Sequence, residues 1–127
     1  MDVAKNSLLL VAEERRNACV LARMLREDGY AVEVLFDGGE AIERLARGPL
    51  PDVLITDLGI PTASGMAVAE FARSCDPEMP VLLLTGYPQL VGKLSGHGIS
   101  AAMVHTKPID YATFSEQLSH LMGVFAA

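Results

Sequence analysis

The chain alternates between short apolar runs and longer stretches with the spacing of amphipathic helices. The runs are rich in Val, Leu and Ile and have the length of strands. We expect strands over residues 8–12, 30–36, 52–57, 81–85 and 101–106. We expect helices over residues 14–28, 38–47, 65–75 and 110–122, and a weaker one of about ten residues from residue 88, where Gly92 and Gly96 lower the helix propensity.

Helical spacing also predicts which side chains face the sheet. These are Ala18, Leu21, Ala22 and Leu25 in the first helix, Ala41, Ile42, Leu45 and Ala46 in the second, Met66, Ala69 and either Phe71 or Ala72 in the third, and Phe114, Leu118 and Leu121 in the last. Residues 30–36 alternate apolar and polar side chains, as expected of an exposed edge strand.

Five strand-then-helix units in this order predict the fold class. Near-continuous apolar strands covered on both faces by helices imply a parallel sheet, and right-handed crossovers leave a doubly wound arrangement. We therefore expect an α/β fold with a five-stranded parallel sheet in the common order 2-1-3-4-5, a flavodoxin-like three-layer sandwich. Ligand sites in such folds lie beyond the carboxyl ends of the strands, at the point where strands one and three part.

Length, charge and cysteine usage narrow the class of protein. With 127 residues, half of them apolar, the chain has the size of one domain, and we expect residues 1–127 to form a single domain without an output domain. A net charge of −6 argues against direct binding to nucleic acid or to an anionic membrane. Cys19 and Cys75 match no metal-binding spacing, so we expect reduced, buried thiols in a cytoplasmic protein.

Polar residues stand where the predicted strands end. Glu13 and Glu14 follow the first strand, Asp57 ends the third, Thr85 ends the fourth, and Lys107 follows the fifth. Because parallel strands place their carboxyl ends at one edge of the sheet, we expect these side chains to meet there. A carboxylate buried at that edge without a partner is strongly destabilising, so a positive or hydrogen-bonding group must reach Asp57.

The chemistry of these groups suits a phosphoryl group and a divalent cation. Neighbouring carboxylates repel one another unless a cation lies between them, and Mg²⁺ prefers carboxylate and carbonyl oxygens together with a phosphate oxygen. Lys107 supplies a positive charge, Thr85 a hydroxyl, and Gly86 a backbone N–H that a ligand can approach. Asp57 can act as a nucleophile that forms an acyl phosphate when nearby cations neutralise the charge of the transferring group.

Over essentially its whole length the chain resembles the receiver domains of two-component response regulators. Receivers have acids after the first strand, an aspartate ending the third strand with proline four and glycine eight residues later, a threonine or serine with a small residue after the fourth, and Lys-Pro after the fifth. Here these features are Glu13-Glu14, Asp57 with Pro61 and Gly65, Thr85-Gly86, and Lys107-Pro108.

The resemblance implies a signalling phosphoacceptor, not an enzyme in the usual sense. Asp57 would accept phosphate from the phosphohistidine of a sensor histidine kinase or histidine phosphotransfer protein, and lose it by slow self-dephosphorylation. Thr85 and Lys107 would bind the phosphoryl oxygens, and the Lys107–Pro108 bond is often cis in this family. Phosphorylation would alter binding to an output protein that the sequence does not name, in a receiver domain that is a monomer or weak dimer.

The resemblance also implies a bound Mg²⁺. Its ligands would be Glu13, Asp57 and the carbonyl oxygen of Gly59, with Glu14 as a further candidate. Two positions depart from the family pattern: Ala12 stands where receivers have the first of their acids, and Val104 stands where they have a switch aromatic.

Three alternatives remain open from the sequence. A pseudo-receiver would act as a phosphorylation-independent interaction module, because Ala12 weakens the metal site. A small metal-dependent phosphatase with an aspartyl intermediate would need a second acid two residues after the nucleophile, where this chain has Gly59. The receiver could be a stand-alone regulator or part of a hybrid kinase, and the residues around Asp57 and Thr85 look more like those of hybrid-kinase receivers than of DNA-binding regulators.

Overall fold

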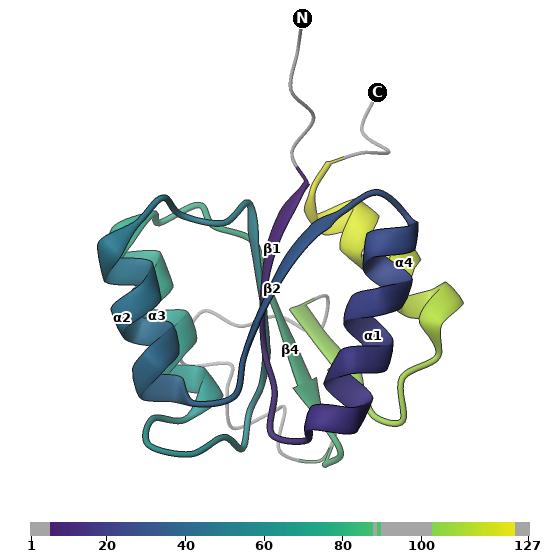
Figure 1. Cartoon of the computed structure of the whole chain (residues 1–127), viewed down its shortest axis with the longest axis horizontal. Helices are drawn as coiled ribbons and strands as arrows, with labels where there is room; N and C mark the ends of the chain where they lie inside the picture. Colours follow the sequence, from purple (N-terminus) through teal and green to yellow (C-terminus); the bar gives the residue numbers. More distant parts are fainter. Residues whose placement is uncertain (1–5, 88, 90–102, 124–127) are drawn as a thin grey trace, which may run out of the picture.

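The computed structural model of the protein describes residues 6–87, 89 and 103–123. Its five parallel strands lie in the order β2-β1-β3-β4-β5 (Figure 1). They are β1 (Ser7–Val11), β2 (Ala31–Leu35), β3 (Val53–Asp57), β4 (Val81–Thr85) and β5 (Val104–Thr106). The described helices are α1 (Arg15–Glu27), α2 (Gly38–Arg47), α3 (Gly65–Cys75) and α4 (Tyr111–Leu121).

The α/β class and the strand order are confirmed. Apart from residue 89, the helix that we expect from residue 88 lies outside the described residues, as do the first two residues of the last predicted strand. No helix in the described part of the chain is long and apolar enough to cross a membrane.

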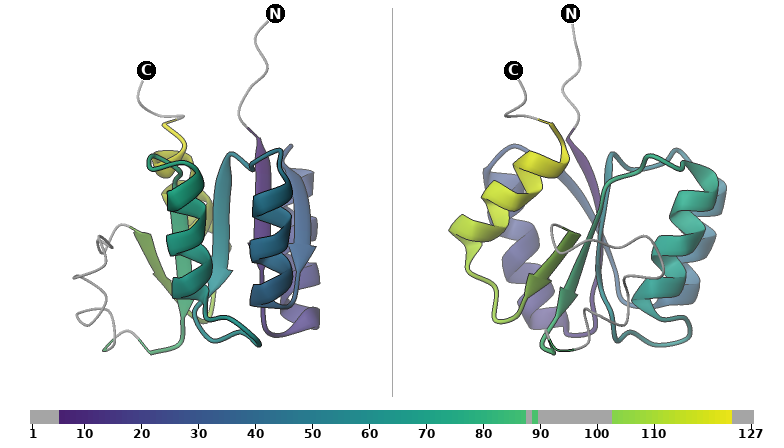
Figure 2. Two further views of the ribbon diagram at one scale, coloured as in Figure 1. Left: turned by 90° about the vertical axis from the view of Figure 1, so that its left-hand side faces the viewer. Right: turned by 180° about the vertical axis from the view of Figure 1, so that it is seen from behind.

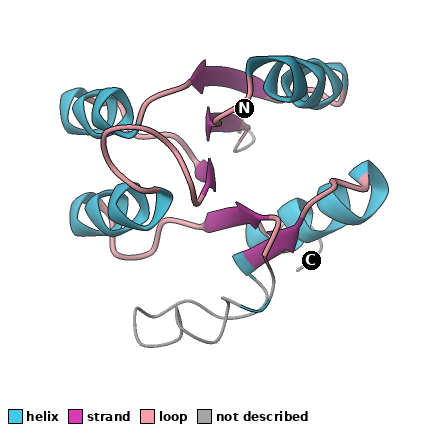
Figure 3. Cartoon of the chain, turned by 90° about the horizontal axis from the view of Figure 1, so that it is seen from below, coloured by secondary structure: helices cyan, strands magenta, loops and turns pink. Residues whose placement is uncertain are grey.

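The helices form two layers, with α1 and α4 on one face of the sheet and α2 and α3 on the other (Figures 2 and 3). Side chains of a strand alternate between faces, so β1 sends Leu8 and Leu10 toward the first layer and Leu9 and Val11 toward the second. Every residue of β3 and β4 is buried, whereas β2 at the edge of the sheet is partly exposed. The edge position predicted for residues 30–36 is therefore confirmed.

The helix faces follow the predicted spacing with a few differences. All four positions predicted in α1 are buried, and Phe114 and Leu118 are buried in α4. Ala46 is exposed, since α2 buries only Ala41 and Leu45 together with Gly38 at its first turn. In α3 the sheet-facing residues include Val68, which the sequence analysis did not select.

The prediction that both cysteines are buried is wrong. Cys19 and Cys75 are exposed. Cys19 follows the buried Ala18, and one residue along a helix turns the side chain by about 100°, away from the apolar stripe. Cys75 is the last residue of α3, beyond the last buried turn of that helix.

The loop between β3 and α3 depends on Gly65. The backbone N–H of Gly65 donates a hydrogen bond to the carbonyl oxygen of Leu58 at 2.8 Å. A Cβ atom at residue 65 would lie 2.0 Å from the carbonyl oxygen of Asp57. The first turn of α3 therefore approaches the end of β3 more closely than any other residue type allows.

We expect Gly65→Ala to destabilise the fold by about 1–3 kcal/mol or more, because the clash is with backbone that cannot move aside alone. Gly86→Ala is a suitable contrast, since a Cβ there meets no atom within 4 Å. Urea unfolding followed by circular dichroism measures both variants. Equal stability of Gly65→Ala and wild type would show that this close approach is not required.

Asp37 caps the N-terminus of α2. Its carboxylate accepts a hydrogen bond from the backbone N–H of Glu40 at 2.9 Å and another from the hydroxyl of Thr62. These bonds, that of Thr62 first, hold the pKa of the Asp37 carboxyl below its ordinary value of 3.8. The carboxylate form is thus favoured in the folded protein.

This lowered pKa predicts a pH dependence of stability. The contribution of Asp37 should be fully present above the pKa of an unfolded aspartate, about 3.9, and disappear as the pH falls through the lower pKa of the folded state. Asp37→Asn should therefore be less stable than wild type near neutral pH, with a gap that narrows below about pH 4. Urea unfolding at a series of pH values measures the gap, and a constant difference across the acid range would contradict this assignment.

Candidate functional site

Asp57, the last residue of β3, is a buried carboxylate with a partner for each oxygen. Its side chain is only 6% exposed. Oδ2 accepts a hydrogen bond from the backbone N–H of Glu13 at 2.8 Å. Oδ1 lies 2.6 Å from the ammonium nitrogen of Lys107, and among the described residues no hydrogen bond reaches it. The ion pair with Lys107 therefore balances the charge at Oδ1.

Strand pairing places Asp57, Thr85 and Lys107 at one edge of the sheet. Asp57 lies opposite Leu84, and the backbone N–H of Leu58 donates to the carbonyl oxygen of Leu84 at 3.1 Å. One strand further, the N–H of Lys107 donates to the carbonyl oxygen of Thr85 at 2.7 Å. The hydrogen-bond ladder thus extends past the strand ends and fixes the positions of Asp57, Thr85 and Lys107.

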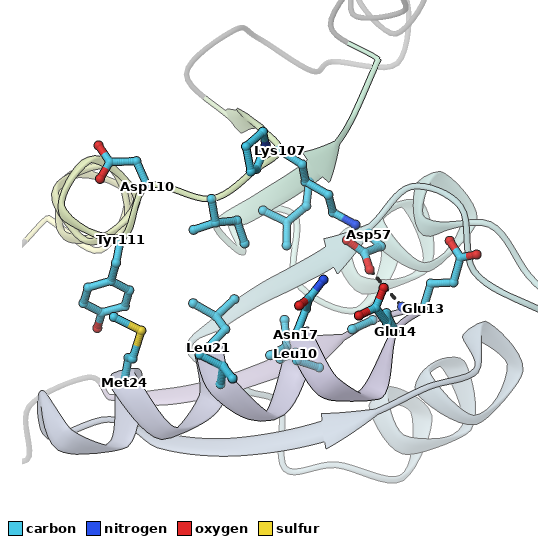
Figure 4. Close-up of a pocket in the computed structure, with 16 residues that line it drawn as sticks. Leu10, Glu13, Glu14, Asn17, Leu21, Met24, Asp57, Lys107, Asp110 and Tyr111 are labelled. Carbon is cyan, nitrogen blue, oxygen red and sulfur yellow. Dashed lines mark hydrogen bonds and ion pairs between the residues drawn. The ribbon is translucent and has the colours of Figure 1, made fainter.

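Lys107 approaches Asp57 from the segment that follows β5 (Figure 4). Its side chain is 39% exposed, so its ammonium group is in contact with both the buried carboxylate and solvent. The Lys107–Pro108 peptide bond is cis, as the family resemblance implies, and the Gly48–Pro49 bond, which the sequence analysis did not consider, is cis as well.

Thr85 is at the same edge but does not bond to Asp57. It is 5% exposed, and its hydroxyl oxygen accepts a hydrogen bond from the backbone N–H of Tyr87 at 3.0 Å. A hydroxyl that accepts one bond keeps its own proton for a second. The Thr85 hydroxyl therefore keeps a proton with which it can donate one further hydrogen bond.

Glu13 and Glu14 place two further carboxylates near Asp57, and the backbone of Gly59 lies beside Glu13. The Glu13 side chain is exposed and extends away from the Lys107 ammonium (Figure 4). A Cβ atom built on Gly59 would lie 3.9 Å from Glu13 Oε2, so the Glu13 carboxylate is adjacent to the Gly59 backbone. Glu14 is the N-cap of α1, but its side chain makes no capping hydrogen bond.

These groups fit a Mg²⁺ ion by their chemistry. Mg²⁺ is commonly held by one or two carboxylates, with waters and phosphate oxygens completing its shell. Asp57 and Glu13 supply carboxylates, and Gly59 adds a carbonyl. No group of three or more His, Cys, Asp or Glu suited to a metal occurs among the described residues, and Ala12 at the remaining position is 5% exposed in the apolar core. The protein therefore contributes only a few of the oxygens that Mg²⁺ needs.

A groove of about 1040 Å³ opens onto Asp57. It runs between α1 and the segment from Lys107 to Tyr111 (Figure 4). Its apolar lining includes Val20, which is 55% exposed, as well as Leu21, Met24 and Ile109. The sequence analysis did not identify this groove; its one local signal is an apolar residue, Val20, placed outside the buried stripe of an amphipathic helix.

Tyr111 closes the far end of this groove. Its hydroxyl donates a hydrogen bond to Asp28 Oδ2 at 2.6 Å and so links α4 to the end of α1. Burial first, and then the hydrogen bond and negative charge of Asp28, raise the pKa of the Tyr111 hydroxyl well above its usual value. The phenol therefore remains a neutral donor throughout the physiological pH range.

Comparison with known proteins identifies similar sequences and folds. The profile of the response regulator receiver domain matches residues 8–119. The transcriptional regulatory protein CreB of Escherichia coli is 36% identical over 106 residues, which cover 84% of this chain and 46% of CreB. The chain thus spans about half the length of the curated relatives it matches. Our prediction of a single receiver domain over residues 1–127 without an output domain stays a prediction.

Solved structures agree in fold. A response regulator receiver protein from Sinorhizobium medicae has a TM-score of 0.84 and 27% identity, and the match covers 93% of this chain and 94% of that protein. The response regulator TrrA of Thermotoga maritima, solved in complex with Mg²⁺-BeF, has a TM-score of 0.81 and 26% identity, with coverage of 91% and 98%. Both structures therefore match the fold of this protein over nearly its whole chain.

The names of the relatives bear on one expectation. Several are transcriptional regulatory proteins, which conflicts with the prediction, made from net charge, that the protein has no direct contact with nucleic acid. The net charge of −6 describes these 127 residues alone, and the matched region covers less than half of each of these relatives.

The Asp57–Lys107 ion pair predicts unequal effects of removing its two partners. Lys107→Met leaves a buried carboxylate with one hydrogen bond, which should cost about 1–3 kcal/mol of stability. Asp57→Asn leaves an ammonium that solvent can reach, so it should cost less or even stabilise. The double variant should therefore be more stable than the sum of the two single changes implies, by about 0.5–3 kcal/mol. Strict additivity in urea unfolding would show that the two groups are not paired in solution.

Proposed function

The chain belongs to the response regulator receiver domain family, and we propose that it is the phosphoacceptor of a cytoplasmic two-component relay, with Asp57 as the residue that receives the phosphoryl group. The observation that carries this proposal is the pairing of the Asp57 carboxylate, 6% exposed, with Lys107 at 2.6 Å. A buried carboxylate is costly to maintain, and this one lies at the end of a groove that a partner can enter.

The two oxygens of Asp57 have different surroundings, and we assign the nucleophile to Oδ1. Oδ2 is held by the backbone N–H of Glu13, which cannot leave without moving the β1–α1 junction. Among the described residues, the partner of Oδ1 is the end of the Lys107 side chain, which has rotatable bonds and access to solvent. Lys107 can therefore release Oδ1 without any change in the backbone.

In the proposed transfer, an electron pair on Oδ1 forms a bond to the phosphorus of a phosphohistidine. The phosphorus–nitrogen bond breaks, and the histidine nitrogen leaves with the two electrons of that broken bond and takes up a proton from solvent. Lys107 moves from Oδ1 to an oxygen of the phosphoryl group and neutralises part of its charge. Thr85 donates a hydrogen bond from its hydroxyl group to another phosphoryl oxygen. Gly86 has no side chain, so a phosphoryl oxygen can approach its backbone N–H.

Glu13, Asp57 and the Gly59 carbonyl are the proposed Mg²⁺ ligands, with Glu14 nearby. When bound, Mg²⁺ would supply positive charge in addition to that of Lys107, so that the negative oxygens of the phosphoryl group could approach the carboxylate. The Mg²⁺-BeF complex of the Thermotoga relative, which shares the fold, supports the binding of Mg²⁺ by this chain. Slow hydrolysis of the acyl phosphate would return Asp57 to its starting state.

The groove also supports a protein as phosphate donor, a histidine kinase or a phosphotransfer protein. α1 borders the groove and carries four arginines and one glutamate, although the whole chain has a net charge of −6. Val20 on the same helix adds an exposed apolar side chain. A donor surface with apolar and acidic side chains would complement α1 and bring its histidine to Asp57.

Incubation with acetyl phosphate tests the proposal. We expect wild type with Mg²⁺ to gain the mass of one phosphoryl group, and peptide mapping to place it on Asp57. Asp57→Asn should gain none, and chelation of Mg²⁺ should slow or abolish the gain in wild type. Lys107→Met should label much more slowly at equal Mg²⁺, because no cation then meets the transferred group from the second side.

Asp28→Asn serves as the matched control, since Asp28 is an exposed carboxylate at the opposite end of the groove. It should label as wild type does. If wild type gains no phosphoryl group under conditions that label an established receiver, the phosphoacceptor proposal is refuted, and the phosphorylation-independent interaction module becomes the better account.

A further inference from the structure

The loop that follows Asp57 is fastened to the start of α2. The backbone N–H of Gly38 donates to the carbonyl oxygen of Pro61 at 2.9 Å, and the N–H of Ala63 donates to the same oxygen at 2.8 Å. A Cβ atom on Gly38 would lie 2.0 Å from the carbonyl oxygen of Ala63, so the two backbones are in close contact. This contact joins segments that are about two dozen residues apart in sequence.

Thr62 lies at the centre of this contact in an unfavourable conformation. Its φ is +75°, the only positive value at a non-glycine residue in the described part of the chain. A β-branched residue rarely adopts this conformation, which costs roughly 1–3 kcal/mol and persists only when surrounding contacts impose it. The side chain is exposed, so burial does not impose it.

Two contacts hold this segment, namely the hydrogen bond from the Thr62 hydroxyl to Asp37 Oδ2 and the backbone hydrogen bonds to the Pro61 carbonyl oxygen. The other oxygen of Asp37 accepts the N–H of Glu40 and caps α2. Asp37 therefore joins the loop to a helix that packs against the sheet through Ala41 and Leu45. The methyl group of Thr62 also contacts Gly39, where a Cβ would lie 2.9 Å from it.

The same loop carries Gly59. Its first residue is fixed to the sheet by the hydrogen bond from the Leu58 N–H to Leu84, and its two ends are joined by the hydrogen bond from the Gly65 N–H to Leu58. Between these ends the backbone contact at Pro61 and the Thr62–Asp37 bond supply its attachment to α2. Gly59 is three residues from Thr62 in the same loop, so a rotation of the backbone at Thr62 shifts the path of the segment that contains the Gly59 carbonyl.

We propose that Asp37 and Thr62 are positioning residues for the metal site, and that their hydrogen bond holds the loop in the conformation that directs the Gly59 carbonyl toward the side occupied by Glu13. This inference rests on the proposed function. Asp37 and Thr62 do not touch the reacting atoms; they act through the backbone of residues 59–62.

Four variants test it. Thr62→Val removes the hydroxyl and keeps the shape of the side chain, whereas Thr62→Ser keeps the hydroxyl. Thr62→Gly relieves the backbone strain without restoring the hydrogen bond, and Asp37→Asn keeps a good N-cap but loses the charged acceptor. The matched control is Thr113→Val, which removes the same kind of bond, from Thr113 to Asp110 at 2.6 Å, at the start of α4.

Titration calorimetry of the unphosphorylated proteins with MgCl₂, well below their melting temperatures, gives the direct readout. We expect Thr62→Val and Thr62→Gly to raise the dissociation constant for Mg²⁺ roughly three- to tenfold, as the loss of one hydrogen bond to a charged group allows. Asp37→Asn should raise it in the same direction. Thr62→Ser and Thr113→Val should bind Mg²⁺ as wild type does.

Hydrogen exchange at the Ala63 amide provides the second readout, since faster exchange in Thr62→Val would show that the loop is released. A purely structural role predicts lower melting temperatures with unchanged Mg²⁺ affinity, and that result would overturn the proposal. It would also be overturned if Thr62→Ser behaved as Thr62→Val does. Wild-type labelling by acetyl phosphate remains a separate result, so failure of this inference is distinguishable from failure of the phosphoacceptor proposal.

Discussion

The Asp57 carboxylate is almost fully buried at the carboxyl edge of the sheet, and the structure around it is arranged to keep its charge there. A buried carboxylate is stable only if each of its oxygens has a hydrogen-bonding or ionic partner. The backbone at the end of β1 meets one oxygen and Lys107 meets the other. Because these partners come from strands on opposite sides of β3, both depend on the strand order.

The remaining features of the site follow from this constraint. The ladder that continues beyond β4 and β5 fixes the direction from which Lys107 approaches. Gly65 lets α3 begin directly against the Asp57 carbonyl, and the loop between them bends back toward α2. The groove beside α1 leaves a route from solvent to the buried carboxylate.

The strands, the helices and the location of the site could be predicted from the sequence because each depends on local patterns. Leu9 and Leu10 point to opposite faces by simple alternation, and polar residues that end parallel strands must meet at one edge. Lys107 reaches Asp57 for that reason. The exposed cysteines were misjudged because their neighbours along the helix, not their own residue type, decide which way they face.

The links between loops could not be predicted in this way. Asp37 and Thr62 meet only because Thr62 adopts a φ of +75°, and a threonine gives no sequence signal of that conformation. Tyr111 reaches Asp28 across 83 positions of sequence. Such contacts depend on how two helices and their loops are placed in space, which periodicity does not specify.

A crystal structure of the protein grown with MgCl₂ and beryllofluoride, a mimic of the phosphoryl group, tests the central claim most directly. We predict that beryllium is bonded to Asp57 Oδ1, that Lys107 Nζ has left Oδ1 and lies within hydrogen-bonding distance of a fluoride, and that Oδ2 still accepts the Glu13 N–H. A structure in which Lys107 remains paired with Oδ1, with no beryllofluoride bound at Asp57, would contradict the account.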